Sequence, residues 1–273
     1  MGSDPTRATR ELLAFYVEAG VDVCLDDEPA DHAGRSRERA VDALEQPEPA
    51  PLAAHATPPQ TPPSTTLPLA PDTAVMAARQ AAKNAATLGE LRRILEGFEG
   101  CVLKQTAKKL VFADGNPQAR VMFVGEAPGR EEDLEGLPFV GRSGQLLDRM
   151  MAAIGLDRTS AYVANIIPWR PPGNRTPTPQ EAAICLPFIL RQIELSHADI
   201  LVCLGGPSAQ ALLGAKQGIL KTRGRWFSYL AGSREIRAIA TLHPAYLLRQ
   251  PLQKRLAWRD LLMLKKALEA PAS

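Results

Sequence analysis

Residues 121–141 read VMFVGEAPGREEDLEGLPFVG and join a buried strand to a glycine-rich loop. Four consecutive apolar residues stand before Gly125, and such a short unbroken run is typical of a strand covered on both faces of a parallel sheet. The loop that follows contains a second glycine, a proline and then an acidic run. The stretch therefore predicts an α/β sheet with carboxylates at the end of one strand.

Three more apolar runs of this kind follow, at residues 161–169, 198–206 and 234–244. Helical periodicity before and between the runs predicts helices over residues 74–86, 88–98, 143–155, 178–195, 207–214 and 258–270. Strands that alternate with helices form a parallel sheet with helices on both faces. The expected fold is an α/β three-layer sandwich around a central, mainly parallel four-stranded sheet.

Each predicted strand ends in a polar or glycine-containing loop: residues 125–129, 165–174, 205–209 and 243–249. The carboxyl ends of parallel strands form the ligand crevice of an open sheet. We therefore expect these four loops to converge on one site.

Each loop also has a simpler explanation. The GEAPG turn has the glycines of a phosphate-binding turn, but the carboxylates of Glu126, Glu131 and Glu132 would repel a phosphate. The proline-rich residues 165–174 could form a merely rigid loop, and His243 could be a structural histidine.

The composition divides the chain into a basic body and an acidic N-terminal region. About one residue in three is proline between positions 46 and 71, which predicts a disordered linker over residues 46–75. The acidic arm before it, residues 1–45, contains an amphipathic pattern at 11–25 that either docks on the body or binds a protein partner. The main domain is expected at residues 76–270.

Residues 1–75 hold 13 acidic against 5 basic side chains, which leaves 17 against 27 for the remainder. A basic domain favours a polyanionic partner, although charge of this kind also serves solubility. The sequence shows neither a run of about 18 apolar residues nor a secretory signal, so we expect a cytoplasmic protein with no membrane contact. Its four scattered cysteines do not suggest a disulfide framework.

Three motifs resemble the family 4 uracil-DNA glycosylases of bacteria and archaea, a branch of the uracil-DNA glycosylase superfamily. The motifs are GEAPGREEDLEGLPFVGRSGQLLDRM, NIIPWRPPGNRTPTPQE and HPAYLLRQP, in that order, within residues 96–266. Their length, order and spacing make the resemblance specific. It implies a monofunctional enzyme of base excision repair that flips deoxyuridine out of DNA and hydrolyses its N-glycosidic bond.

The resemblance implies a uracil-binding pocket with defined roles for five residues. Asn165 would accept a hydrogen bond from uracil N3–H and donate one to O4, a pattern that cytosine reverses. Phe139 would stack on the base, and the backbone of Glu126 and Ala127 would contact it. His243 would donate to O2 and stabilise the departing uracil anion.

Two carboxylates have implied catalytic roles. Glu126 would orient the attacking water, whereas Glu132 resembles the position that walls off C5 of the base, where a thymine methyl group would clash. The sequence leaves open which of the two lies closer to the water.

The same resemblance and the loop chemistry imply a DNA-binding surface. Leu247, Leu248 and Arg249 would enter the helix where the base leaves. Contacts to phosphates are expected from Arg170, Arg175, Lys254, Arg255 and the GGPSA turn with Ser208.

One departure from the family concerns its four-iron four-sulfur cluster, which four cysteines hold. Cys101 and Cys185 match two of these positions, but Phe98 and Trp169 occupy the other two. Because such clusters require thiolates, we expect no cofactor here. The alternative is a cluster completed by Cys203 or by a ligand other than cysteine.

The expected function is thus uracil excision, by a monomer, from single- or double-stranded DNA. Two other functions stay open on the sequence. One is a glycosylase of the same fold for another deaminated base, such as hypoxanthine or xanthine, and the other is a catalytically silent DNA-binding module.

Overall fold

The computed structural model of the chain describes residues 71–270. The expected arm at 1–45 and most of the expected linker lie outside this range. Helix α3 (Pro71–Lys83) already begins at the first described residue, so positions 71–75 are helical and do not belong to a linker.

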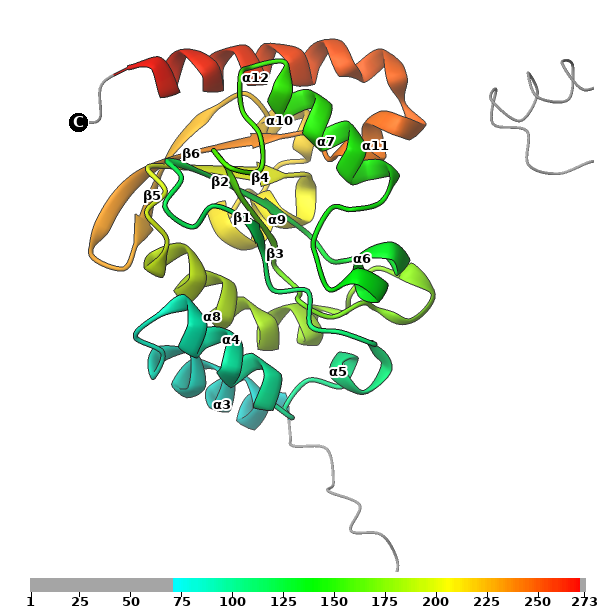
Figure 1. Ribbon diagram of the computed structural model, residues 1–273, viewed down its shortest axis with the longest axis vertical. Helices are drawn as coiled ribbons and strands as arrows, with labels where there is room; N and C mark the ends of the chain where they lie inside the picture. Colours follow the sequence, from blue (N-terminus) through cyan, green and yellow to red (C-terminus); the bar gives the residue numbers. More distant parts are fainter. Residues whose placement is uncertain (1–70, 271–273) are drawn as a thin grey trace, which may run out of the picture. The chain divides into compact units, whose positions relative to one another are not determined.

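A six-stranded mixed sheet forms the centre of the fold, in the order β1-β3-β2-β4-β6-β5 (Figure 1). The four central strands β3, β2, β4 and β6 are mutually parallel, and the edge strands β1 and β5 pair antiparallel with their neighbours. The bounds of the strands in chain order are β1 Asp114–Gly115, β2 Val121–Gly125, β3 Tyr162–Asn165, β4 Ile200–Leu204, β5 Trp226–Ala231 and β6 Arg234–Thr241.

Helices cover both faces of the sheet and connect its strands. After α3 the α-helices are α4 Leu88–Gly97, α5 Leu103–Thr106, α6 Arg130–Glu135, α7 Arg142–Ala152, α8 Pro179–Leu195, α9 Gly206–Leu213, α10 Ile219–Thr222, α11 Pro244–Arg249 and α12 Lys254–Glu269. Two short 3-10 turns, Pro172–Asn174 and Pro251–Gln253, complete the described structure.

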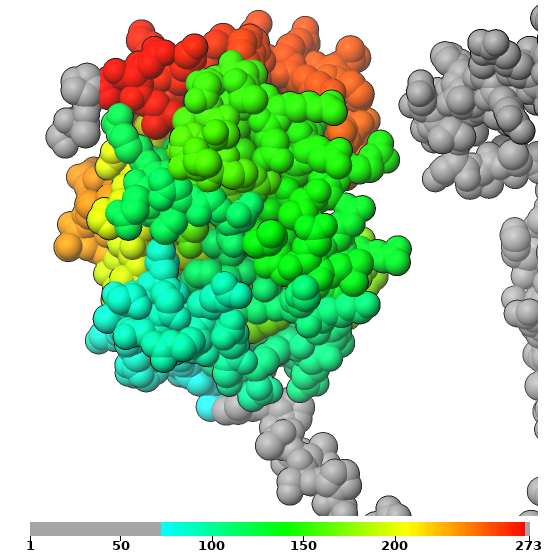
Figure 2. Space-filling model, viewed as in Figure 1, coloured from blue at the N-terminus to red at the C-terminus, as the bar shows by residue number. Residues whose placement is uncertain are grey.

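The strands alternate their side chains between two apolar cores. On β2, Met122 and Val124 face a core shared with α3, α4, α8 and α9, whereas Val121 and Phe123 face one shared with α7, α11 and α12. Figure 1 shows these two helical layers on opposite sides of the sheet. Helix α11 packs beside α7, where the orange and green surfaces meet in Figure 2.

The predicted three-layer α/β architecture is confirmed, as are the four parallel strands. The sequence did not predict the two edge strands, and α12 begins at Lys254, four residues before the expected start. Within residues 71–270, no helix combines the length and the apolar character that crossing a membrane requires.

Candidate active site

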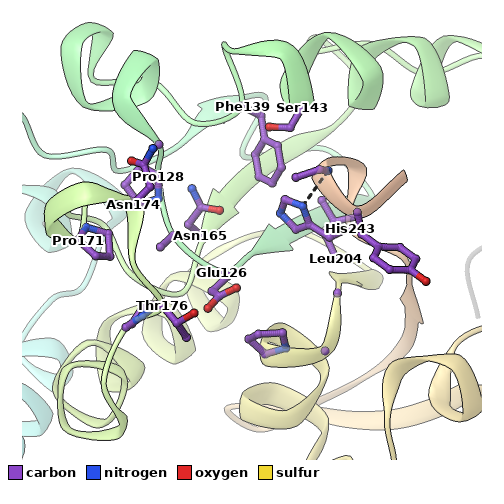
Figure 3. A pocket seen from close by; sticks show the side chains of 18 of the residues that line it. Glu126, Pro128, Phe139, Ser143, Asn165, Pro171, Asn174, Thr176, Leu204 and His243 are labelled. Carbon is purple, nitrogen blue, oxygen red and sulfur yellow. Dashed lines mark hydrogen bonds between the residues drawn. The ribbon is translucent and has the colours of Figure 1, made fainter. Parts of the chain in front are cut away.

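A pocket of about 570 Å³ opens at the carboxyl ends of the four parallel strands. Its wall includes Glu126 after β2, Asn165 at the end of β3, Gly205 after β4 and His243 after β6. The expected convergence of the strand-end loops is therefore confirmed. Figure 3 shows the side chains of Phe139, Asn165 and His243 gathered around this space.

Asn165 lies 4% exposed at the end of β3, and its Oδ1 has no hydrogen-bond partner among the described residues. A buried amide oxygen without a partner is costly unless a ligand supplies the missing donor. Gly125, directly opposite in the parallel register, leaves the necessary room because a Cβ there would collide with Asn165 Oδ1 and lie 2.5 Å from Phe139 Cζ. The amide is thus available to a flat polar molecule in the pocket.

Phe139 forms an aromatic wall of the pocket and is 4% exposed. Its φ of 56° places it in the left-handed region, which residues with a Cβ rarely adopt. The ring lies 5.6 Å from the His243 ring, centroid to centroid, at an angle of 32°. Such a wall suits stacking against a planar base.

His243 ends the loop after β6 and caps α11, because its Nδ1 accepts a hydrogen bond of 3.1 Å from the Ala245 N–H (Figure 3). Burial, assisted by the charge of Arg249, lowers the pKa of His243 to about 4, although Glu132 opposes the shift. The imidazole is therefore neutral at pH 7 and carries its proton on Nε2, which is free to donate.

Glu126 is the pocket carboxylate without a hydrogen-bonding partner for its side chain among the described residues. Burial raises the pKa of this carboxyl above its ordinary value. A partly buried, unpaired carboxylate of this kind can hold a water molecule or take up a proton.

Glu132 also lines the pocket, but backbone donors already occupy its carboxylate. One oxygen accepts from Val140 N–H and Gly141 N–H at 3.1 and 3.0 Å, and the other from Gly129 N–H at 3.0 Å. Glu132 thereby joins the GEAPG turn to the loop that carries Phe139.

The predicted DNA wedge needs two corrections. Leu247 is 1% exposed and packs in the core shared with α7, because the helical phase of α11 turns it inward. Ser208 is fully buried, and its hydroxyl donates to Val124 O at 2.7 Å, so it cannot bind a phosphate. Leu248 remains exposed, and Arg249 lines the pocket mouth.

The two arginines predicted in the proline-rich loop differ in their surroundings. Arg175 lines the pocket and forms a bidentate pair with Glu181 at 2.8 and 2.6 Å, which lowers the pKa of Glu181. Arg170 lies outside the pocket wall, donates to Asn174 Oδ1 at 2.7 Å and approaches Asp133 at 3.9 Å. Its observed contacts tie the loop to α6.

The cysteine positions of the family cluster lie together in the core on the α8 side of the sheet. Cys101 and Cys185 are fully buried with their Sγ atoms 3.9 Å apart, and Trp169 is buried in the same core. The partner ring of Phe98 is Phe188, at 5.0 Å in edge-to-face geometry. Two thiols, with aromatic residues at the other two family positions, do not fit a cluster that needs four thiolate ligands.

Within the described range 71–270, no three His, Cys, Asp or Glu side chains gather in a way that would hold a metal ion. Cys203 lies in β4 with its side chain in the core, as the strand pattern predicted.

The sequence analysis missed several residues of the pocket wall, among them Ser143, Asn174 and Tyr246. Ser143 stands at the start of α7, and Tyr246 lies three positions after His243 in α11. Asn174 and Tyr246 stand directly beside the predicted residues Arg175 and Leu247, and this adjacency is the signal that would have found them.

An open α/β sheet that presents an unpaired amide, a neutral imidazole, a carboxylate and an aromatic ring at its strand ends defines an enzyme for planar, hydrogen-bonding bases. A comparison with known families identifies the superfamily within this class of enzymes. The profile of the uracil DNA glycosylase superfamily matches residues 112–262, and the chain belongs to this superfamily.

Several relatives are named type-4 uracil-DNA glycosylase. The protein of Thermotoga maritima is 43% identical over 150 residues, which cover 55% of this chain and 77% of the relative. The protein of Archaeoglobus fulgidus is 38% identical over 60% of this chain and 85% of its own length. The protein of Saccharolobus solfataricus is 37% identical over 62% and 81%, respectively.

Proposed function

We propose that this chain is a uracil-DNA glycosylase of type 4, which acts in DNA repair by hydrolysing the N-glycosidic bond of deoxyuridine. It belongs to the superfamily, and its relatives bear that name at 37 to 43% identity. The observation in the site that carries the proposal is the buried, unpaired Oδ1 of Asn165. Uracil supplies a donor at N3 for this oxygen, whereas cytosine has an acceptor there.

The base would enter the pocket after flipping out of the DNA. Phe139 would stack on its face, and Asn165 would pair with N3–H and O4. The backbone of Glu126 and Ala127 borders the same space, which supports the predicted contacts to the base.

Bond cleavage leaves negative charge on uracil, mostly at O2, and positive charge on the sugar. His243 is neutral and lines the pocket, and because its Nδ1 accepts from Ala245 N–H, Nε2–H is the donor that remains available. We assign this donor to O2 of the leaving base. One such donor is typically worth about 2.7 to 4 kcal/mol in the transition state.

The two carboxylates now receive different roles. Glu126 has a free carboxylate, so we assign it the attacking water and the electrostatic stabilisation of the sugar cation. Glu132 is held by three backbone N–H groups, so we assign it to the rigid wall at C5 of the base.

Binding of DNA is expected at the pocket mouth. Arg249 and the exposed Leu248 lie on α11 beside His243, and Arg175 is fixed across the pocket by Glu181. Leu248 is the wedge that remains once Leu247 is assigned to the core. Because one chain brings all these groups together, the enzyme would work as a monomer.

The proposal includes no iron-sulfur cluster. Trp169 is buried in the same core as the two remaining cysteines, and the Phe98 ring folds back over Gly100, where an added Cβ would lie 2.5 Å from Phe98 Cζ. Buried aromatic side chains contribute a few kcal/mol each and can hold these segments through packing.

The test is excision from oligonucleotides that carry a single uracil, thymine, hypoxanthine or xanthine, followed by hot alkali to cleave at the abasic site. We expect cleavage at uracil in single- and double-stranded DNA and none at thymine. Asn165→Ala should lower uracil excision at least about tenfold, because it leaves the base edge unpaired. Asn84→Ala, an exposed asparagine between α3 and α4, is the matched control and should retain full activity.

The same assay separates the other functions. Cleavage at hypoxanthine or xanthine with none at uracil would indicate a different base, and binding without cleavage of any substrate would indicate a silent DNA-binding module. Either result would overturn the proposal.

A further inference from the structure

The backbone at Phe139 adopts a conformation that this residue does not prefer on its own. Its φ of 56° is left-handed, and its Cβ disfavours that region. The start of α7 leaves room for this conformation, since a Cβ on Gly144 would collide with the Phe139 carbonyl. Something outside the residue must hold it there.

Two side chains hold this loop through hydrogen bonds to its backbone. Glu132 accepts the N–H groups of Val140 and Gly141, immediately after Phe139. Arg158 donates to the carbonyls of Pro138 and Phe139, at 3.2 Å from Nη1 and 2.7 Å from Nη2. Both carbonyls accept hydrogen bonds from the same planar guanidinium. Arg158 therefore favours the backbone conformation in which the two carbonyls point in the same direction.

Two aspartates hold the Arg158 side chain in place. Its Nε donates to Asp148 on α7 at 2.7 Å, and its Nη1 contacts Asp114 on β1 at 3.1 Å. The side chain is 23% exposed, and it is not among the residues of the pocket wall. We therefore expect Arg158 to influence the reaction through the Pro138–Phe139 backbone that it holds.

We propose that Arg158 is a positioning residue, which locks the Pro138–Phe139 backbone so that the Phe139 ring stands ready to stack on the flipped base. This inference rests on the proposed uracil-excising function. Catalytic groups displaced by about 1 Å can lose about a hundredfold in rate, so a remote lock of this kind has a measurable effect.

The test is a double-mutant cycle between Arg158→Met and Phe139→Ala, followed by single-turnover excision of uracil. We expect Arg158→Met to lower the rate about tenfold in the wild-type background and less than about twofold in the Phe139→Ala background. Affinity for an abasic duplex should change less than about twofold, because no base remains to stack on. An equal loss of rate in both backgrounds would overturn the proposal.

Arg120→Met is the matched control. Arg120 also joins a carboxylate, Asp199, to a main-chain carbonyl, Leu268 O, and lies outside the pocket wall. Its replacement should leave excision unchanged. Arg158→Lys guards against misfolding, because it retains a positive charge for Asp148 but lacks the planar fork that directs several N–H groups at once. We expect a partial loss of rate that again disappears in the Phe139→Ala background.

A second measurement does not depend on activity. Amide hydrogen exchange at Val140 and Gly141 should accelerate at least about tenfold in Arg158→Met and stay unchanged in Arg120→Met. Unchanged exchange in Arg158→Met would overturn the proposal that Arg158 holds this backbone. If the wild-type chain excises no uracil, the proposed function fails, while this measurement still tests the lock.

Discussion

At the scale of single residues, burial shifts the pKa values of the two side chains to which we assign catalytic roles in opposite directions. Burial lowers the pKa of His243 to about 4, so this side chain stays a neutral donor at physiological pH. Burial raises the pKa of Glu126 and therefore works against the ionised form that the role we assign to this carboxylate requires. We therefore expect Glu126 to set the acidic limit of the reaction, because His243 is still neutral at the pH at which this carboxyl begins to take up a proton.

We predict that His243→Ala lowers single-turnover uracil excision about a hundredfold or more, as for other lost oxyanion donors. The factor should be nearly constant from about pH 5.5 to 8, because the imidazole does not titrate there. Single-turnover rates across this range measure the factor, and His197→Ala, at an exposed histidine outside the pocket wall, should have no effect.

A rate profile with a midpoint near pH 6.5 that disappears in His243→Asn would contradict the prediction.

The stability of the protein offers an independent check of the lowered pKa of His243. The unfolded chain has the ordinary histidine pKa of 6.5, so it binds more protons than the folded chain between this value and about 4. The free energy of unfolding should consequently fall as the pH falls through this window, and less so in His243→Asn.

The sequence predicted the site residues that lie at the ends of strands. It did not predict features that depend on the phase of a helix or on contacts between distant segments. Asn165 and His243 follow apolar runs, so their meeting at one edge of a parallel sheet was predictable. Leu247 and Leu248 are adjacent in the sequence, and only the packing of α11 on α7 shows which of them is buried. The contacts of Arg158 depend on three separate segments and have no local signal.

At the scale of elements, three of the four central strands, β2, β3 and β4, were predictable because each is a short run of residues buried on both faces. In β6 only the second half, from Ala238 onward, is continuously buried. The edge strands gave no comparable signal. β1 has two residues, and β5 alternates partly exposed and buried positions in its hairpin with β6. Edge strands are exposed on one side, so their sequences need less apolar character.

The elements around Cys101 and Cys185 lead to a prediction about metal content. We expect protein purified without oxygen to be colourless, with no absorption shoulder near roughly 400 nm and negligible iron, because two of the four thiolate positions are Phe98 and Trp169. Optical spectra and iron analysis provide the measurement.

The double variant Phe98→Cys/Trp169→Cys is the positive control, since it restores all four cysteine positions. After anaerobic treatment with iron and sulfide it should bind about four irons per chain, and the wild-type chain should bind none. Brown wild-type protein with about four irons would contradict the prediction and make Cys203 the next ligand to test.

At the scale of the whole molecule, the sequence has an acidic N-terminal part and a basic remainder, which should interact differently with DNA. The excess of basic residues after position 75 suits a domain that approaches DNA, whereas the acidic N-terminal region would repel it. The structure moves the boundary between them, because α3 begins at Pro71 and buries Ala74 and Ala78 in the core shared with α8. A role of residues 1–45 in binding a protein partner stays a prediction.

Two truncations test this boundary. Deletion of residues 1–70 should leave uracil excision on short oligonucleotides and the thermal midpoint nearly unchanged, because the pocket and both cores lie within the described residues. Deletion of residues 1–83 also removes α3 and exposes the face of α8 that its alanines cover. We expect the thermal midpoint of this second variant to fall by at least about 5 °C, which corresponds to a loss of about 1 to 2 kcal/mol in a domain of this size. Calorimetry and excision assays on both variants decide the matter: an inactive but folded 71–273 fragment would show that the N-terminal region belongs to the catalytic unit.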